Sequence, residues 1–147
     1  MDAGAASRFS IIVPVYMQWR LIPALLKRLG SQGFPSDRFE VILVDNGSPE
    51  FSPLTDLPAN AEVLRCEVPG SYAARNYGSH KARGDWLIFT DADCLPASDW
   101  LERIDEGIDR HGSNALIAGP VDIVSSTGKP GPWEIFDMVK GIPQERY

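Results

Sequence analysis

Apolar and polar residues follow two different periods along the chain, and these periods predict strands and helices in turn. Short apolar runs bounded by turn residues predict strands, and apolar residues spaced three and four positions apart predict helices. Strands are predicted at residues 9–15, 39–45, 61–67, 85–90 and 115–124. Helices are predicted at residues 18–29, 71–82 and 96–110, with a further short helix at 133–140.

This alternation predicts an α/β, Rossmann-like fold with a mostly parallel sheet. Strands joined through helices need right-handed crossovers, and these place helices on both faces of the sheet. The 147 residues, 44% of them hydrophobic, are enough for one domain over residues 1–147 with a genuine core. Pro14 suits the end of the first strand, and Pro23 is tolerated only in the first turns of the following helix.

Three predicted strands end in residues with distinctive chemistry. Pro14-Val15-Tyr16 closes the first strand, Asp45 ends the second before Asn46-Gly47, and Asp91-Ala92-Asp93 follows the strand at 85–90. In open α/β sheets, ligands bind in the crevice beyond the carboxyl ends of the strands. One ligand lying across this edge of the sheet would explain why these residues cluster there.

The pair Asp91 and Asp93 is the most informative of these features. A period of two along an extended backbone would put both carboxylates on one side, where their repulsion is relieved by a shared proton or a cation. Hard oxygen ligands favour Mg²⁺ or Mn²⁺, with substrate phosphates completing the shell. The same pair also suits an acidic turn that caps the next helix, so the motif alone leaves both interpretations open.

Asp45 and Arg75 each have two interpretations as well. Asp45 could accept hydrogen bonds from a base or a ribose, or form an Asx-turn into Asn46-Gly47. Arg75, near the start of a predicted helix, could grip a phosphate, or pair at the surface with a neighbouring acid. Neither the G-x-G-x-x-G fingerprint nor a P-loop is present, which argues against NAD, FAD and P-loop nucleotide binding.

The net charge of −6 and the lack of a basic stripe argue against a nucleic-acid partner. Charge is nevertheless uneven, because residues 71–84 contain bases and no acid, whereas residues 85–109 contain eight acids and one base. This arrangement suits a site for a phosphate and a metal, and equally suits two solvated helix faces.

The two cysteines, Cys66 and Cys94, lie outside any CxxC motif and are expected to be reduced thiols. The first seven residues lack the apolar region of a signal peptide, and no run of 18 apolar residues is present. These features lead us to expect a cytoplasmic location.

Four motifs occur in a fixed order: Val13-Pro14-Val15-Tyr16, Val44-Asp45-Asn46-Gly47-Ser48, Ala74-Arg75-Asn76-Tyr77-Gly78, and the stretch 82–93 that ends in Asp91-Ala92-Asp93. In this order they resemble the nucleotide-sugar-binding part of family 2 glycosyltransferases, which have the GT-A fold. The resemblance extends over residues 9–100. One departure is Asn46, which stands where the family usually has a second acid.

The resemblance implies a role for each strand end. Asp45 would bind the base or ribose beside a wall made by residues 14–16, and Asp93 would bind Mn²⁺ or Mg²⁺ directly. Asp91 would share the metal motif and contact the sugar or ribose. The implied nucleotide-binding residues are Pro14, Val15, Tyr16, Asp45, Arg75 and Asp91.

The activity implied is metal-dependent transfer of a sugar, with inversion, from a nucleotide donor that is typically UDP-linked. The metal would offset charge on the departing diphosphate. The acceptor hydroxyl could belong to a saccharide, a lipid or another compound, and the resemblance allows peripheral membrane association of the full-length protein. The alternative is a non-catalytic module that binds nucleotide-sugars.

Inverting transfer needs a general base, and Asp122, Glu134 and Asp137 do not stand in a matching context. We therefore read these acids as structural or surface residues. We expect the chain to be truncated before the acceptor-binding part, with the base beyond Tyr147. Apolar residues in the stretch 131–147 would then be exposed and favour self-association.

Overall fold

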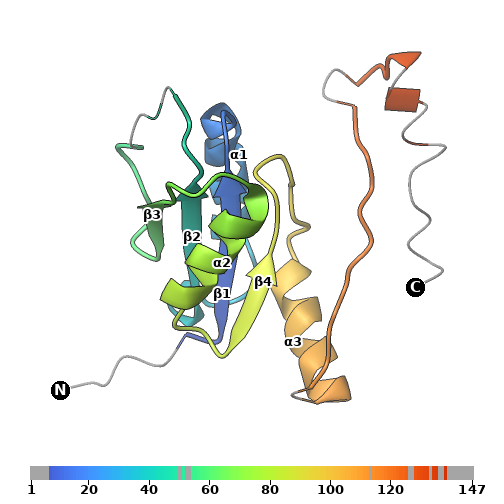
Figure 1. The fold of residues 1–147 in the computed structure, drawn as a ribbon. Helices are drawn as coiled ribbons and strands as arrows, with labels where there is room; N and C mark the ends of the chain where they lie inside the picture. Colours follow the sequence, from blue (N-terminus) through green and yellow to red (C-terminus); the bar gives the residue numbers. More distant parts are fainter. Residues whose placement is uncertain are drawn as a thin grey trace. The chain divides into compact units, whose positions relative to one another are not determined.

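The fold is an α/β structure, shown in Figure 1, built on a parallel sheet. The computed structural model describes residues 7–49, 51, 54–112, 114–125, 128–132, 134–135 and 138 of the chain. Its elements in chain order are β1 (Phe9–Val15), η1 (Trp19–Leu21), α1 (Ile22–Gly30), η2 (Ser36–Arg38), β2 (Phe39–Asp45), β3 (Ala61–Arg65), α2 (Ser71–Lys81), β4 (Trp86–Phe89) and α3 (Trp100–His111).

The four strands of this sheet lie in the order β3-β2-β1-β4, and every neighbouring pair is parallel. The chain thus moves outward from β1 through β2 to β3, and then crosses back through α2 to place β4 on the other side of β1. The Rossmann-like α/β fold expected from the sequence is confirmed. The bounds of β1 and β2 match the predicted strands.

Helix α2 covers one face of the sheet because its inward residues are small. Ala74 and Gly78 are its buried residues. A Cβ atom at Gly78 would lie 2.7 Å from a methyl of Ile12 and 3.0 Å from a methyl of Val44. Since these two residues lie on neighbouring strands, α2 packs across both β1 and β2, as Figure 1 shows.

On the opposite face of the sheet, β1 packs against the loop that follows α1. Alternation along β1 turns Phe9 away from α2, and its ring lies 5.0 Å from the ring of Phe34, in the loop after α1. In the same loop, Gln32 donates to Ala97 O at 2.7 Å and accepts from Leu101 N at 3.1 Å. These bonds bring the start of α3 beside the end of α1.

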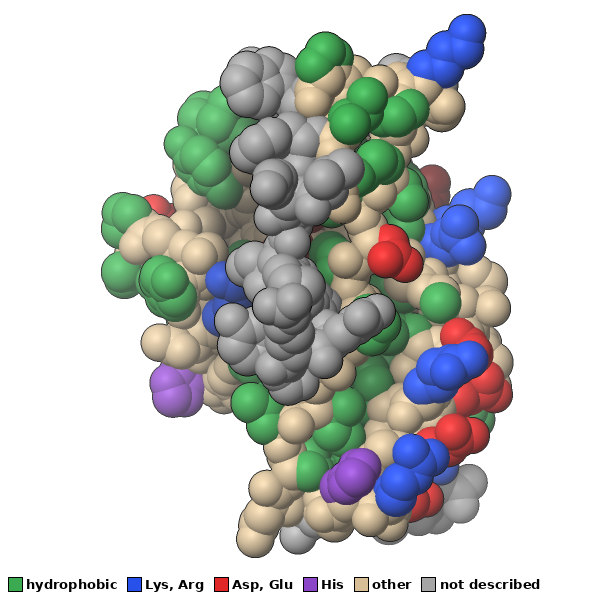
Figure 2. Space-filling model, turned by 90° about the vertical axis from the view of Figure 1, so that its right-hand side faces the viewer, with side chains coloured by type: hydrophobic (Ala, Val, Ile, Leu, Met, Phe, Trp, Pro, Cys, Tyr) green, Lys and Arg blue, Asp and Glu red, His purple; other side chains and the backbone are tan. Residues whose placement is uncertain are grey.

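Helix α3 is amphipathic, as its spacing predicts, although it begins at Trp100 and not at residue 96. Leu101 and Ile108 are buried. Figure 2 shows acidic and basic side chains interleaved on the surface of the molecule at the height of this helix. Arg103, in its first turn, pairs at 2.6 Å with Asp99, the residue just before the helix. The charges of α3 therefore lie on a solvated helix face, whereas Asp91 and Asp93 of the same acidic stretch precede this helix.

The predicted strand at residues 115–124 is wrong. In the described part of the chain this segment forms no ladder with any strand, and Leu116 is 99% exposed. It belongs to a second compact unit, residues 107–147, separate from the unit formed by residues 1–106. Gly119-Pro120 interrupts the apolar run, and a proline cannot donate to a sheet ladder.

The C-terminal unit also contains part of the predicted helix at 133–140. Pro132, Glu134, Ile135 and Met138 are helical, while Trp133, Phe136, Asp137 and residues 139–147 lie outside the described residues. Ile135 is 48% and Met138 43% exposed. Some apolar side chains of this stretch are therefore exposed, as expected.

Two other expectations concern cysteines and membrane spans. Cys66 is buried, Cys94 is half-buried, and both are free thiols. Within the described ranges, no helix has the length and apolar character needed to cross a bilayer.

A buried carboxylate closes the amino end of the sheet. Glu40, which is 3% exposed, accepts from Ser10 Oγ and from Arg83 N, both at 2.6 Å. Arg83 Nη2 also lies 2.6 Å from Glu40 Oε2, without the alignment of a hydrogen bond. Burial raises the pKa of Glu40, but the contacts from Ser10 and Arg83 together lower it by more, so the pKa lies below its ordinary 4.5.

We expect Glu40→Gln to lower the free energy of unfolding by about 1–3 kcal/mol at neutral pH, because a neutral amide loses these charge-assisted bonds. Since the folded-state pKa is lowered, the stabilisation is present above the ordinary glutamate pKa and is lost as pH falls through the folded value. Urea unfolding between about pH 3 and pH 7 measures both effects. The exposed Asp37→Asn is the control, and an equal pH slope in parent and Glu40→Gln would contradict the account.

We expect Gly78→Ala to destabilise the protein despite a helix-propensity gain of about 1 kcal/mol, because its Cβ has no room against Ile12 and Val44. Overpacking of this kind costs about 1–3 kcal/mol. Gly30→Ala is the matched control, since a Cβ at Gly30, also on a helix, meets nothing within 4 Å. Thermal unfolding should rank Gly78→Ala below the parent and Gly30→Ala at or above it.

Candidate functional site

A pocket of about 250 Å³ opens at the carboxyl end of the sheet. Its walls come from the ends of β1 and β2, the start of α2 and the turn after β4. The lining residues are Pro14, Val15, Tyr16, Gln18, Asn46, Ser71, Asp91 and Asp93. This is the point where the strand order reverses, with β2 on one side of β1 and β4 on the other, and ligands of open α/β sheets bind at such switch points.

The pocket forms because β1 extends farther than β4. Pairing of β1 with β4 ends at Ile12 and Phe89, with a last bond from Thr90 N to Ile12 O at 3.3 Å. Pairing with β2 continues to Val15. Every second residue of β1 directs its backbone N–H and C=O toward β4, and Ile12 and Pro14 belong to this set. Pro14 has no N–H to donate, but β4 has already ended at this position, so no ladder bond is lost.

Asp91 and Asp93 both reach the pocket, but through a turn and not through an extended strand. β4 ends at Phe89, and Cys94 N donates to Asp91 O at 3.1 Å, which closes a turn over these residues. Ala92 between them is buried at 1% exposure and anchors the turn. The structure therefore brings the two predicted carboxylates together at one pocket.

Arg75 lies beside this pair without lining the pocket. Its Nη2 lies 2.6 Å from Asp91 Oδ1, with 28% of the arginine side chain and 56% of the aspartate side chain exposed. Both interpretations of Arg75 thus retain support. It pairs with a neighbouring acid, and that acid is a pocket residue.

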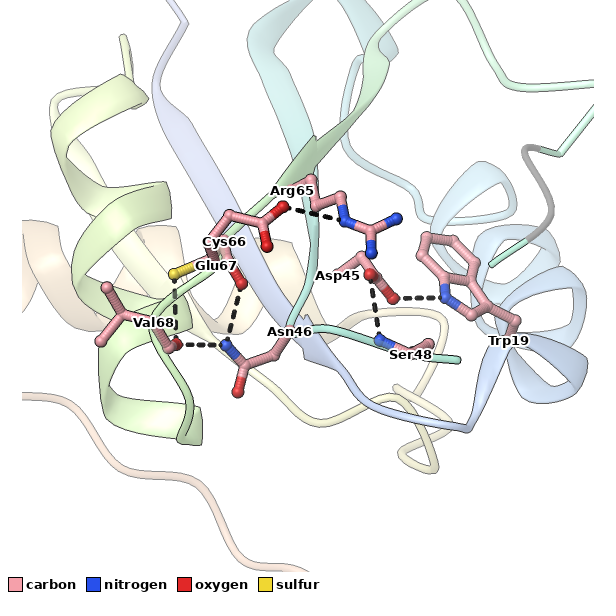
Figure 3. A network of polar contacts seen from close by, with 8 residues as sticks. All are labelled: Trp19, Asp45, Asn46, Ser48, Arg65, Cys66, Glu67 and Val68. Atoms are coloured by element: carbon pink, nitrogen blue, oxygen red, sulfur yellow. Dashed lines mark hydrogen bonds and ion pairs between the residues drawn. The ribbon is translucent and has the colours of Figure 1, made fainter. Parts of the chain in front are cut away.

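The end of β2 contributes Asn46 to the pocket, whereas Asp45 does not line it. Asp45 is fully buried; its carboxylate accepts from Trp19 Nε1 at 2.8 Å and from Ser48 N at 3.2 Å. Figure 3 shows Trp19 and Ser48 at the Asp45 carboxylate, while Asn46 points to the loop of Cys66 and Val68. In this structure the Asp45 carboxylate is therefore not accessible to a ligand.

Asn46 fixes the loop that leads into α2. Its Nδ2 donates to Val68 O at 2.7 Å and to Cys66 O at 3.3 Å, and its Oδ1 accepts from Gly70 N at 2.7 Å. Gly70 has φ +109°, a backbone conformation that residues other than glycine rarely adopt. The amide group thus sets where the next residue, Ser71, begins α2 at the pocket wall.

Gln18, Asn46 and Ser71 are pocket residues that the sequence did not single out as such. The N-cap of α2 is Gly70, and no side chain caps the helix. Their positions in the sequence could have identified all three as pocket residues, since each follows a strand end or begins a helix at the carboxyl end of the sheet. Their residue types alone carry no specific chemistry.

The donor set at the pocket fits a hard divalent cation. The described residues contain no group of three or more His, Cys, Asp or Glu side chains that would enclose a metal. Two exposed carboxylates, Asp91 and Asp93, suit Mg²⁺ or Mn²⁺, because these ions keep water and substrate phosphate as most of their ligands. Arg75 already pairs with Asp91, so a cation would compete with its guanidinium.

Comparisons with known proteins identify the family and the fold of this chain. The model of glycosyl transferase family 2 matches residues 10–142. Glycosyltransferase AglE of Haloferax volcanii is 38% identical over 128 residues, which cover 81% of this chain and 41% of AglE. The chain therefore spans less than half the length of this relative.

Two solved structures share the fold. TarS 1–349 of S. aureus in complex with UDP superposes with a TM-score of 0.59 at 31% identity, over 71% of this chain and 32% of that one. The mannosyltransferase PcManGT of Pyrobaculum calidifontis, in complex with GDP-Man and Mn²⁺, gives a TM-score of 0.61 at 29% identity, over 72% and 35%. The α/β fold is the GT-A fold of these neighbours, and the chain belongs to glycosyl transferase family 2.

Proposed function

We propose that this chain binds the nucleotide-sugar donor of a transferase that moves a sugar onto an acceptor hydroxyl with inversion. One observation carries the proposal: the pocket at the strand-order reversal places an apolar and aromatic wall, residues 14–16, at the same site as Asp91 and Asp93. A base needs the first feature, and a metal-bound diphosphate needs the second.

Several groups in and beside the pocket suit the nucleotide. Tyr16 is 56% exposed, so its ring is available to a base. Helix α2 begins at the pocket with Ser71 and has no acid in its first turn, so its N-terminal dipole favours a phosphate there. Arg75 neutralises Asp91 and has further N–H groups for phosphate oxygens.

Asp91 and Asp93 would hold Mn²⁺ or Mg²⁺. When bound, such an ion offsets the negative charge that grows on the departing diphosphate. The neighbour solved with GDP-Man and Mn²⁺ supports this assignment. The neighbour solved with UDP supports a UDP-linked donor, and we take UDP as the first ligand to test.

The acids of the C-terminal unit are not assigned to proton transfer. Glu134 accepts from Gly131 N at 2.7 Å and from Ser125 Oγ at 3.2 Å, so it holds a turn of its own unit. Asp122 is exposed in the extended segment. We propose donor binding, and not deprotonation of the acceptor, as the task of the described residues.

The proposal predicts that UDP binds in the presence of Mn²⁺ and that Asp93→Ala weakens this binding at least about tenfold, because one of two carboxylates is lost. Calorimetric titration with and without Mn²⁺ measures it. Asp37→Ala is the matched control, since Asp37 is exposed before β2, at the other end of the sheet. Equal affinity in Asp93→Ala and parent, or no binding of UDP and GDP by the parent, would refute the proposal.

A second prediction concerns the pocket wall. Asn46→Ala should weaken UDP binding about tenfold, because alanine loses the donor to Cys66 O and Val68 O and the acceptor for Gly70 N. The same calorimetric titration measures it.

Asn60→Ala is the control for this variant. Asn60 donates in the same way to Ser36 O and Phe39 O, both at 3.1 Å, but lies at the amino end of β2. The variant at Asn60 should lose stability but keep its affinity for UDP. Equal losses of affinity in both variants would show that general destabilisation, and not the pocket wall, is responsible.

A further inference from the structure

Asp45 is a buried carboxylate whose two oxygens are both used inside the protein. It is 0% exposed; Oδ1 accepts from Trp19 Nε1 at 2.8 Å, and Oδ2 accepts from Ser48 N at 3.2 Å. A charge removed from water is stable only with such partners. Because the side chain is fully buried, any ligand that used this carboxylate would first have to displace the groups that cover it.

Both partners of Asp45 belong to the loop system that forms the pocket wall. Ser48, 2% exposed, accepts from Met17 N at 3.0 Å through its hydroxyl. Trp19 opens η1, three residues after Tyr16 of the wall. Asp45 is therefore connected to the segment 16–19 twice, through the indole of Trp19 and through the backbone and hydroxyl of Ser48.

The segment between these two connections is conformationally unusual. Met17 has φ +57°, and it is the single non-glycine residue with positive φ among the described residues. Long side chains adopt this left-handed conformation only where the surroundings hold them in it. The residues on either side, Tyr16 and Gln18, both line the pocket, so the strained residue determines where two pocket side chains lie.

We propose that Asp45 is a positioning residue: it acts through Trp19 and Ser48 to hold the strained turn at Met17, and does not itself contact the nucleotide. The inference rests on the proposed function of the pocket. It differs from the role implied by the sequence resemblance, in which Asp45 binds the base or ribose. It also differs from a simple Asx-turn, because the indole of Trp19 ties Asp45 to a different loop.

The two roles predict different behaviour for a pair of variants. Asp45→Asn keeps the size of the side chain but loses one of its two acceptor atoms. Trp19→Phe leaves the carboxylate intact and removes only its indole donor. If Asp45 positions the turn, both variants should damage the same property, whereas a direct contact with the base would survive Trp19→Phe.

The first measurement needs no ligand. Amide hydrogen exchange at Met17 and Ser48 should be faster in Asp45→Asn and in Trp19→Phe than in the parent, since both N–H groups depend on this network. Trp86→Phe, on the distant β4, is the control for loss of an indole and should leave these two amides unchanged. Unchanged exchange in Asp45→Asn would overturn the inference.

The second measurement is affinity for UDP, CDP and GDP in the presence of Mn²⁺. Asp45→Asn and Trp19→Phe should each weaken every nucleotide that the parent binds by a similar factor, about tenfold, and the double variant should be no weaker than either. Parental affinity in Trp19→Phe, together with a loss confined to one base in Asp45→Asn, would overturn the inference. If the parent binds none of the three, the proposed function fails, while the exchange measurement still decides whether Asp45 holds the turn.

Discussion

The reversal of strand order at β1 is the constraint on which the rest of this structure depends. Because β2 and β4 lie on opposite sides of β1, the connections that leave the carboxyl ends of β1 and β4 diverge. Shorter pairing on the β4 side then opens a space beside Pro14. The pocket is thus a consequence of topology, and its chemistry follows from which residues the sequence places just after each strand.

Strand β2 has a buried carboxylate at each end, and the two have different consequences. Glu40 at the amino end joins β1 to the connection before β4, far from the pocket. Asp45 at the carboxyl end joins the loops after β1 and β2. Since both charges are removed from water, each stabilises the fold only while its partners remain in place. Glu40 therefore contributes to stability far from the pocket, whereas Asp45 contributes beside the pocket, where we propose that it also holds the loop geometry.

Much of this fold could be predicted from periodicity, because parallel strands such as β1 and β2 are buried on both faces and read as unbroken apolar runs. The segment 115–124 has a similar composition but forms no ladder in the described structure. Apolar periodicity predicts which residues are buried, but it does not show whether a neighbouring strand is available for pairing. It therefore cannot decide whether an apolar segment joins the sheet. The starts of α1 and α3 shifted for a related reason, since helix ends depend on local bonds that periodicity does not contain.

The site was predictable in its residue types and less so in its geometry. Asp91, Asp93 and residues 14–16 meet at one pocket, as the strand-end argument requires. The same argument could not decide whether Asp45 or Asn46 faces the pocket. Adjacent residues at a strand end point to opposite sides, and the sequence does not show which side is which. Only the structure shows that Asp45 turns inward to Trp19 while Asn46 reaches the pocket.

The central claim is that this carboxyl-edge pocket binds a nucleoside diphosphate together with a divalent cation. Its most direct test is a two-dimensional NMR spectrum of the ¹⁵N-labelled chain with UDP and a trace of Mn²⁺, since the paramagnetic ion broadens the amides nearest to it. The account predicts broadening centred on Ala92 and Asp93 that extends to Ser71 and Tyr16. Broadening centred on the amino edge, at Arg38 and Gly84, or none that depends on UDP, would contradict it.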